Sequence, residues 1–102
     1  MIAYFFHPEA SAELEDASMF YESRMVGLGK SFCAEVQRTV TLIRQFPDTG
    51  LTVGPSRRRV VVPRFPYSLV YRHDTDAIVI LAVSHQRRKP GYWRRRKSNE
   101  AV

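Results

Sequence analysis

The sequence predicts an α+β domain with two layers, a β-sheet and a helical hairpin that covers one of its faces. Residues 2–6 form a short, aromatic-rich run of strand type, and residues 8–46 contain two stretches with the apolar spacing of helices. After residue 58 the chain contains three further strand-like runs, separated by short turns. The length of 102 residues is typical of one domain, so we assign residues 1–102 to a single domain in which 97–102 form a basic or disordered tail.

The first helix is predicted to begin at Pro8, because proline is favoured in the first turn and the neighbouring Glu9 suits the positive end of the helix dipole. Apolar residues then recur at spacings of three or four until a break at Gly27: Ala10, Leu14, Ala17, Tyr21 and Met25. Four acidic residues are expected mainly on the other faces of this helix: Glu13, Glu15, Asp16 and Glu22. The first helix is therefore the acidic part of the chain.

The second helix is predicted to follow a tight turn at Gly27-Leu28-Gly29 and to end before Pro47. Its apolar positions also form one stripe: Phe32, Val36, Val40 and Ile43, with Leu42 and Phe46 alongside. Because so few residues join the two helices, we expect them to pack as an antiparallel hairpin.

The second half of the chain predicts an antiparallel meander, because only short turns separate the strand-like residues 59–62, 67–72 and 77–83. Residues 47–56, between the hairpin and the meander, predict a turn and a loop. The last strand is apolar on both faces, so we expect it to lie in the centre of the sheet with both faces covered. The helical hairpin accounts for one face. An apolar face left open on the other side would indicate a partner.

The charge of the chain is polarised along its length. Residues 1–50 hold seven acidic and four basic residues, a net charge of −3, and residues 51–102 hold three acidic and twelve basic residues, a net charge of +9. A basic half of this kind attracts nucleic acid, an acidic protein or an anionic surface. The single cysteine, Cys33, excludes an intrachain disulfide, and the N-terminal apolar run is too short for a signal peptide or a membrane span. We therefore expect a cytoplasmic protein without a membrane partner.

Candidate functional residues gather directly after the last strand: His85, Arg87, Arg88 and Tyr92. Together with Arg64, which lies in the stiff bend at residues 63–66, they could bind a phosphate group and transfer protons in a metal-independent cleavage of RNA. No Asp or Glu lies between Thr49 and His73, so the base of such a reaction would have to be His85 or Tyr92.

Each of these residues also has a structural interpretation. His85 could cap the end of the strand, Arg64 could form a salt bridge to the acidic first helix, and Trp93 is expected to pack against the domain. Residues 94–97 are expected to form a solvated basic tail. The three histidines and the cysteine lack the spacing of a metal site, so the sequence predicts no metal and no cofactor.

Several short motifs occur in order over residues 1–96: His7-Pro8-Glu9-Ala10, Gly27-Leu28-Gly29, Phe46-Pro47, Arg64-Phe65-Pro66-Tyr67, and ILAVSHQRRKPGYW at residues 80–93. Together they resemble the RelE/ParE superfamily of bacterial type II toxins. The resemblance implies the same order of strand, helical hairpin and three strands. It also implies a plasmid-stabilising toxin that inhibits growth until a cognate antitoxin wraps over its surface in a hetero-oligomeric complex.

The resemblance implies two possible activities. ParE-like members inhibit DNA gyrase, whereas RelE-like members are metal-independent endoribonucleases that cut messenger RNA in the ribosome. The functional positions of the ribonuclease branch match Arg64, His85, Arg87, Arg88 and Tyr92 here. The ribonuclease branch has two patterns, and the central strands here lack the lysines of one and the carboxylate of the other, so the sequence favours a ParE-like gyrase inhibitor. The alternatives are the ribosome-dependent endoribonuclease and, more remotely, a small basic nucleic-acid-binding module.

Overall fold

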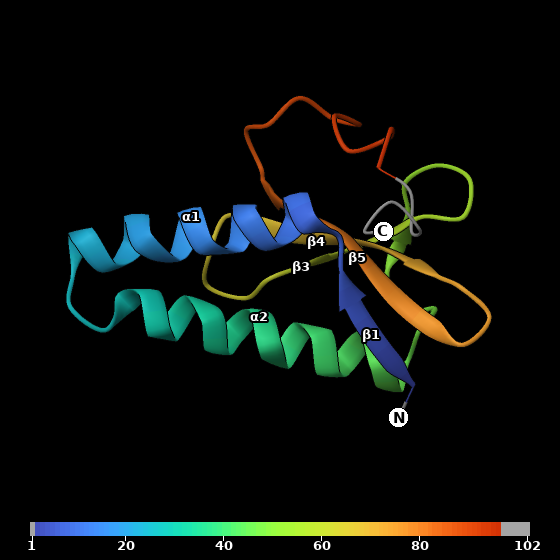
Figure 1. Cartoon of the computed structure of the whole chain (residues 1–102), viewed down its shortest axis with the longest axis horizontal. Helices are drawn as coiled ribbons and strands as arrows, with labels where there is room; N and C mark the ends of the chain where they lie inside the picture. The colour runs from blue at the N-terminus through green and yellow to red at the C-terminus, as the bar shows by residue number, and fades with distance from the viewer. Residues whose placement is uncertain (1, 97–102) are drawn as a thin grey trace.

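The computed structural model describes residues 2–96, and its order of elements confirms the predicted strand, helical hairpin and meander (Figure 1). The elements are β1 (Ala3–Phe6), α1 (Pro8–Arg24), α2 (Leu28–Gln45), β2 (Leu51–Thr52), β3 (Arg58–Val61), β4 (Tyr67–His73) and β5 (Ala77–His85). Neither helix is long and apolar enough to cross a membrane. The tail predicted at 97–102 lies outside the described residues.

The sheet has five strands in the order β1-β5-β4-β3-β2. Strands β3, β4 and β5 pair antiparallel, as the meander predicts, while β1 lies parallel to β5 and pairs Ala3 with Ala77. The central position of β5 is confirmed, since it lies between β1 and β4. Strand β2 replaces part of the predicted loop. It contains only two residues, too few for an alternating pattern to be visible in the sequence.

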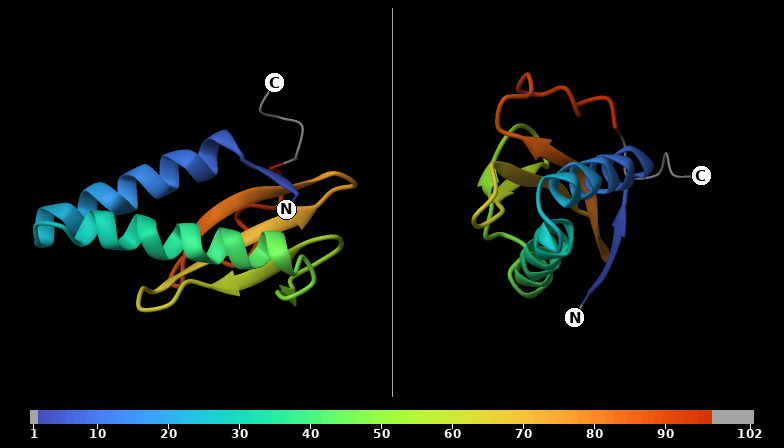
Figure 2. Two further views of the ribbon diagram at one scale, coloured as in Figure 1. Left: turned by 90° about the horizontal axis from the view of Figure 1, so that it is seen from below. Right: turned by 90° about the vertical axis from the view of Figure 1, so that its left-hand side faces the viewer.

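The two helices run antiparallel and lie on the same side of the sheet, as Figure 2 shows. His7 caps α1, because its Nδ1 accepts a hydrogen bond of 3.1 Å from the backbone N–H of Glu9, and Pro8 occupies the first turn. At the hairpin turn, the carboxylate of Glu22 accepts hydrogen bonds from the backbone N–H groups of Gly27 and Gly29, at 2.9 and 3.0 Å. These bonds satisfy backbone donors that the first turn of α2 leaves without helical partners.

The core between the hairpin and the sheet is built largely from the predicted stripes. Its fully buried helical residues are Ala10, Phe32, Val40 and Ile43, with Ala17 and Val36 nearly so. The prediction was wrong for Met25, which is 63% exposed because α1 ends at Arg24 and Met25 adopts an extended conformation. Leu42 and Phe46, expected beside the second stripe, are also exposed.

The opposite face of the sheet is covered by residues 86–96, which return over it after β5. Trp93 is only 6% exposed and packs with Val70 and Ala82, which confirms the expected packing of this tryptophan. The apolar side chains in the middle of this face are therefore covered by the chain itself. The expected solvated tail was wrong for Arg96, which is 8% exposed.

Candidate functional site

The site begins where β5 continues beyond its neighbour β1. Strand β1 ends at Phe6, which pairs with Ile80, and the chain then turns into α1. One residue further, β5 contains a bulge: Val70 pairs with Ala82 and Tyr71 with Ile80, so Leu81 has no partner in β4. The backbone carbonyl of Leu81 and the N–H of Val83 therefore need partners from outside the sheet, since buried backbone polar groups are costly when unpaired.

Two charged side chains supply those partners. Oε1 of Glu13, in α1, accepts a hydrogen bond of 3.0 Å from the N–H of Val83, and Nη1 of Arg96 donates one of 3.0 Å to the carbonyl of Leu81. Arg96 also binds both carboxylate oxygens of Glu13, at 2.9 and 3.0 Å. Glu13 thus faces the sheet, which corrects the expectation that it would lie on another face of the first helix.

Tyr92 and Arg88 complete what we call the Glu13 cluster, whose members are Glu13, Arg88, Tyr92 and Arg96. The hydroxyl of Tyr92 donates a hydrogen bond of 2.8 Å to Oε2 of Glu13. Nη1 of Arg88 lies 3.9 Å from the same oxygen, and its guanidinium lies 3.8 Å from the centre of the Tyr92 ring. Each carboxylate oxygen therefore already accepts two hydrogen bonds.

The cluster shifts the ionisation of its own members. Burial and the hydrogen bond to Glu13 raise the pKa of Tyr92 above its usual value, so that the phenol stays protonated at neutral pH. For Arg96, burial alone would lower the pKa, but the hydrogen bonds to Glu13 outweigh it and the pKa is raised. Both effects keep Tyr92 and Arg96 as hydrogen-bond donors.

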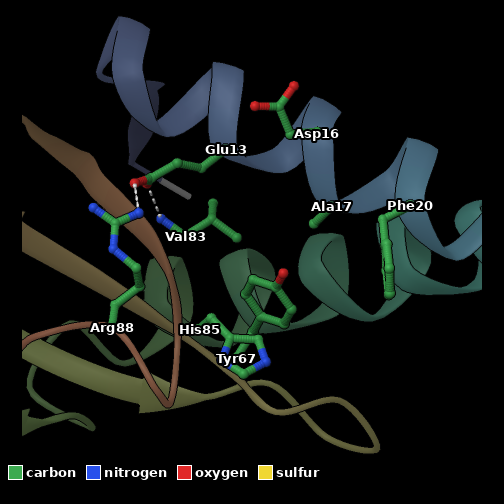
Figure 3. A pocket seen from close by; sticks show the side chains of 8 residues that line it. All are labelled: Glu13, Asp16, Ala17, Phe20, Tyr67, Val83, His85 and Arg88. Carbon is green, nitrogen blue, oxygen red and sulfur yellow. Dashed lines mark hydrogen bonds and ion pairs between the residues drawn. The ribbon is translucent and has the colours of Figure 1, made fainter.

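An open pocket of about 280 Å³ lies beside the cluster, between α1 and the end of β5 (Figure 3). Its lining residues are Glu13, Asp16, Ala17, Phe20, Tyr67, Val83, His85 and Arg88. Nδ1 of His85 accepts a hydrogen bond of 3.0 Å from the backbone N–H of Arg87, so the neutral ring carries its proton on Nε2. The ring also packs edge-on against Tyr67, with centroids 5.0 Å apart. These contacts match the structural interpretation of His85 as the cap of the last strand.

The structure brings together three of the five predicted site residues. His85 and Arg88 line the pocket, and Tyr92 contacts Arg88. The exposed Arg87 does not line the pocket. Arg64 lies elsewhere, in the β3–β4 connection, where its Nη1 is 3.2 Å from Oε2 of Glu35. The expected salt bridge of Arg64 exists, but its partner is in α2 and not in the first helix.

Sequence reasoning missed Glu13 and Arg96. The sequence contained a weak signal for Glu13. It lies three residues after Ala10 and four before Ala17, so it falls on the same face of the helix as these buried residues. Arg96 gave no signal, because the third residue of a run of four basic residues looks in sequence like a solvated one. Among residues 2–96, no group of three His, Cys, Asp or Glu side chains could hold a metal ion.

Residues 4–90 match the family described as the ParE toxin of the type II toxin-antitoxin system parDE. The chain belongs to this family. No curated protein sequence matches this ParE toxin. Among solved structures, it resembles a chain of the chromosomal ParDE toxin-antitoxin system from P. aeruginosa, with 22% identity and a TM-score of 0.68. That likeness covers 83% of this chain and 96% of the other, and it supports the fold.

Membership confirms the predicted superfamily and the predicted role as the toxin of a type II system. It also implies a cognate ParD antitoxin as partner. The hydrogen bonds within the Glu13 cluster limit the chemistry that its side chains can perform in this ParE toxin.

Proposed function

We propose that this ParE toxin inhibits DNA gyrase by binding it and catalyses no RNA cleavage, and that its action lies in the cytoplasm. ParE-family toxins are known gyrase inhibitors. The observation that carries the proposal for this chain is the saturated carboxylate of Glu13, which accepts hydrogen bonds from Val83, Tyr92 and Arg96. It is the only carboxylate within hydrogen-bonding distance of Tyr92 among residues 2–96.

Metal-independent RNA cleavage requires a base that can take the proton of the 2′-hydroxyl group. The Tyr92 hydroxyl donates a hydrogen bond to Glu13, and its raised pKa keeps the phenol protonated. Nδ1 of His85 is already an acceptor for the N–H of Arg87. Arg64, the strand-borne arginine of the ribonuclease interpretation, pairs with Glu35 and lines neither pocket that His85 lines. These contacts argue against RNA chemistry at His85 and Tyr92 and support a toxin that acts by binding, with residues 1–102 acting as a single toxin domain.

The proposal is tested by inducing the chain in cells and following both messenger RNA and DNA. We expect intact messages, double-strand DNA breaks and filamentation, because gyrase inhibition damages DNA. A double variant, His85→Ala with Tyr92→Phe, should remain toxic, since neither side chain performs chemistry. New codon-associated ends in primer extension, lost in this double variant, would establish the ribonuclease instead.

We further propose that the ParD antitoxin covers apolar side chains at the hairpin turn, which projects beyond the sheet (Figures 1 and 2). Four large apolar residues there are at least half exposed: Met19, Phe20, Met25 and Val26. Such a concentration of exposed apolar surface is typical of a protein interface. The acidic faces of α1 are close by, so a basic segment of the partner would complement them.

Val26 offers a clean test of this surface, because it is 92% exposed and its replacement should leave the fold intact. Val26→Ser combined with Met19→Ser should weaken binding of the antitoxin about tenfold or more, measured by calorimetry on the purified pair. Ala12→Ser, at an exposed position of α1, serves as the control. Equal affinity in all three proteins would place the antitoxin on another surface.

A further inference from the structure

We propose that a second pocket, on the sheet face opposite the helices, binds a phosphodiester group of a nucleic acid strand. The pocket has a volume of about 350 Å³ and lies between the sheet and the returning residues 86–96. This inference goes beyond the proposed function and does not depend on it, because the binding can be measured without gyrase.

The floor of this pocket follows from the strand register. Arg59 of β3 pairs with Val70 of β4, and Ser68 of β4 pairs with Ser84 of β5. Residues directly opposite each other in a sheet share a face, and all four line the pocket. The floor therefore presents one guanidinium and two hydroxyl groups around an apolar centre.

The walls of the pocket add further positive charge. Residues 86–96 contribute Arg88 and Arg94, and His85 lies at the boundary with the first pocket. The complete lining is Val53, Arg59, Ser68, Val70, Ser84, His85, Gln86, Arg88, Pro90, Gly91, Trp93 and Arg94. It contains three arginines and no carboxylate. Within residues 2–96, neither Arg59 nor Arg94 forms an ion pair, so both guanidinium groups are available to an anion.

The guanidinium of Arg94 lies against the backbone of this segment. Gly91 has φ of 81°, in the left-handed region, and a Cβ atom built on it would lie 2.7 Å from Cζ of Arg94. The guanidinium of Arg94 therefore packs directly on the α-carbon of Gly91, where no other residue leaves room for it. A glycine at this position both forms the turn and leaves room for the guanidinium of Arg94.

The chemistry of the lining indicates phosphate. Planar guanidinium groups match phosphate oxygens in paired hydrogen bonds, and serine hydroxyl and glutamine amide groups are further donors. A nucleic acid strand presents phosphates at regular intervals and is attracted to the basic half of this chain. Recognition of this kind depends on the phosphate and not on the base sequence.

Trp93 provides a direct probe, because it is the only tryptophan of the chain and lines the pocket. We would titrate the purified full chain with short DNA and RNA oligonucleotides of equal sequence and with inorganic phosphate, following tryptophan emission and the anisotropy of a labelled strand. Wild-type affinity should fall steeply between about 50 and about 200 mM salt. Comparison of the DNA and RNA titrations identifies which strand supplies the phosphate.

Single substitutions distinguish binding in the pocket from non-specific attraction by the net positive charge of the chain. Arg59→Gln and Arg94→Gln should each weaken binding about tenfold and lower the slope of log affinity against log salt by about one. Arg95→Gln, an exposed neighbour outside the pocket, should change affinity by less than about threefold. Gly91→Ala should also weaken binding, although it removes no charge, because the new Cβ displaces Arg94.

Three results would overturn the proposal. Equal losses in Arg59→Gln, Arg94→Gln and Arg95→Gln would show that binding reflects net charge alone. A protein that bound inorganic phosphate but neither oligonucleotide would exclude a nucleic acid strand from this pocket. Trp93 emission that did not change when the strands bound would exclude it too. Circular dichroism of each variant verifies that the losses do not come from unfolding.

Discussion

Glu13 joins three parts of the chain that are distant in sequence. Its carboxylate contacts the backbone of β5 at Val83 and the side chains of Tyr92 and Arg96, while its own backbone belongs to α1. The side chains of Glu13 and Arg96 are 16% and 9% exposed, so the ion pair is largely shielded from water. Removing one partner of such a pair leaves the other charge buried without compensation, which is more costly than losing an exposed ion pair.

Replacing Arg96 by alanine should therefore lower the free energy of unfolding by about 3 kcal/mol. The loss combines the uncompensated charge of Glu13 with the unpaired carbonyl of Leu81. Urea unfolding at neutral pH measures the effect. Arg95→Ala, at the exposed neighbouring position, should stay within about 0.5 kcal/mol of the wild type. Equal stability of the two variants would mean that the Glu13 cluster does not hold the C-terminal segment.

The helical hairpin depends on a close approach between α1 and α2. Gly29 is buried at this crossing, and a Cβ atom there would lie 2.5 Å from the backbone carbonyl oxygen of Ser18. Because a backbone atom cannot give way as a flexible side chain can, any larger residue would push the helices apart. Gly27 differs, since its surroundings are open and only its φ of 89° favours glycine.

Gly29→Ala should consequently destabilise the protein by about 2 kcal/mol or more through overpacking. Gly27→Ala should cost only about 1 kcal/mol, the strain of a left-handed alanine. Thermal unfolding of the two variants in parallel measures this order. A greater loss for Gly27→Ala would show that turn conformation matters more than helix contact.

The fold as a whole was largely predictable, because apolar periodicity reports burial and the stripes at Ala10, Phe32 and Val40 were all confirmed. The two-residue β2 and the parallel pairing of β1 with β5 left no comparable pattern. The site was less predictable for a different reason. The helical spacing of Glu13 gives only a weak signal that it faces the sheet, and nothing in the sequence identifies the strand it binds 70 positions away.

Tyrosines that are wholly or partly buried make the stability of the whole molecule sensitive to alkaline pH. Burial raises the pKa of four of them above the usual value of 10.0: Tyr21, Tyr67, Tyr71 and Tyr92. Above that value the unfolded chain loses tyrosine protons that the folded chain keeps, so the unfolded state binds fewer protons and the free energy of unfolding falls as pH rises. Below it, this contribution is fully present.

Urea unfolding at a series of pH values should therefore show a decline that begins near pH 10 and continues until the folded tyrosines ionise. Tyr92→Phe should make the decline shallower, because one of the four groups is removed. A free energy of unfolding that stays level through this range would contradict the burial of these phenols.

The central claim is that this ParE toxin acts on gyrase through binding and not through RNA chemistry. The most direct measurement is DNA supercoiling by purified gyrase in the presence of the purified toxin. The account predicts loss of supercoiling for the wild type and for the His85→Ala and Tyr92→Phe double variant, with activity restored when the ParD antitoxin is added. Full supercoiling in the presence of a toxin that still stops growth, together with cleaved messenger RNA, would contradict it.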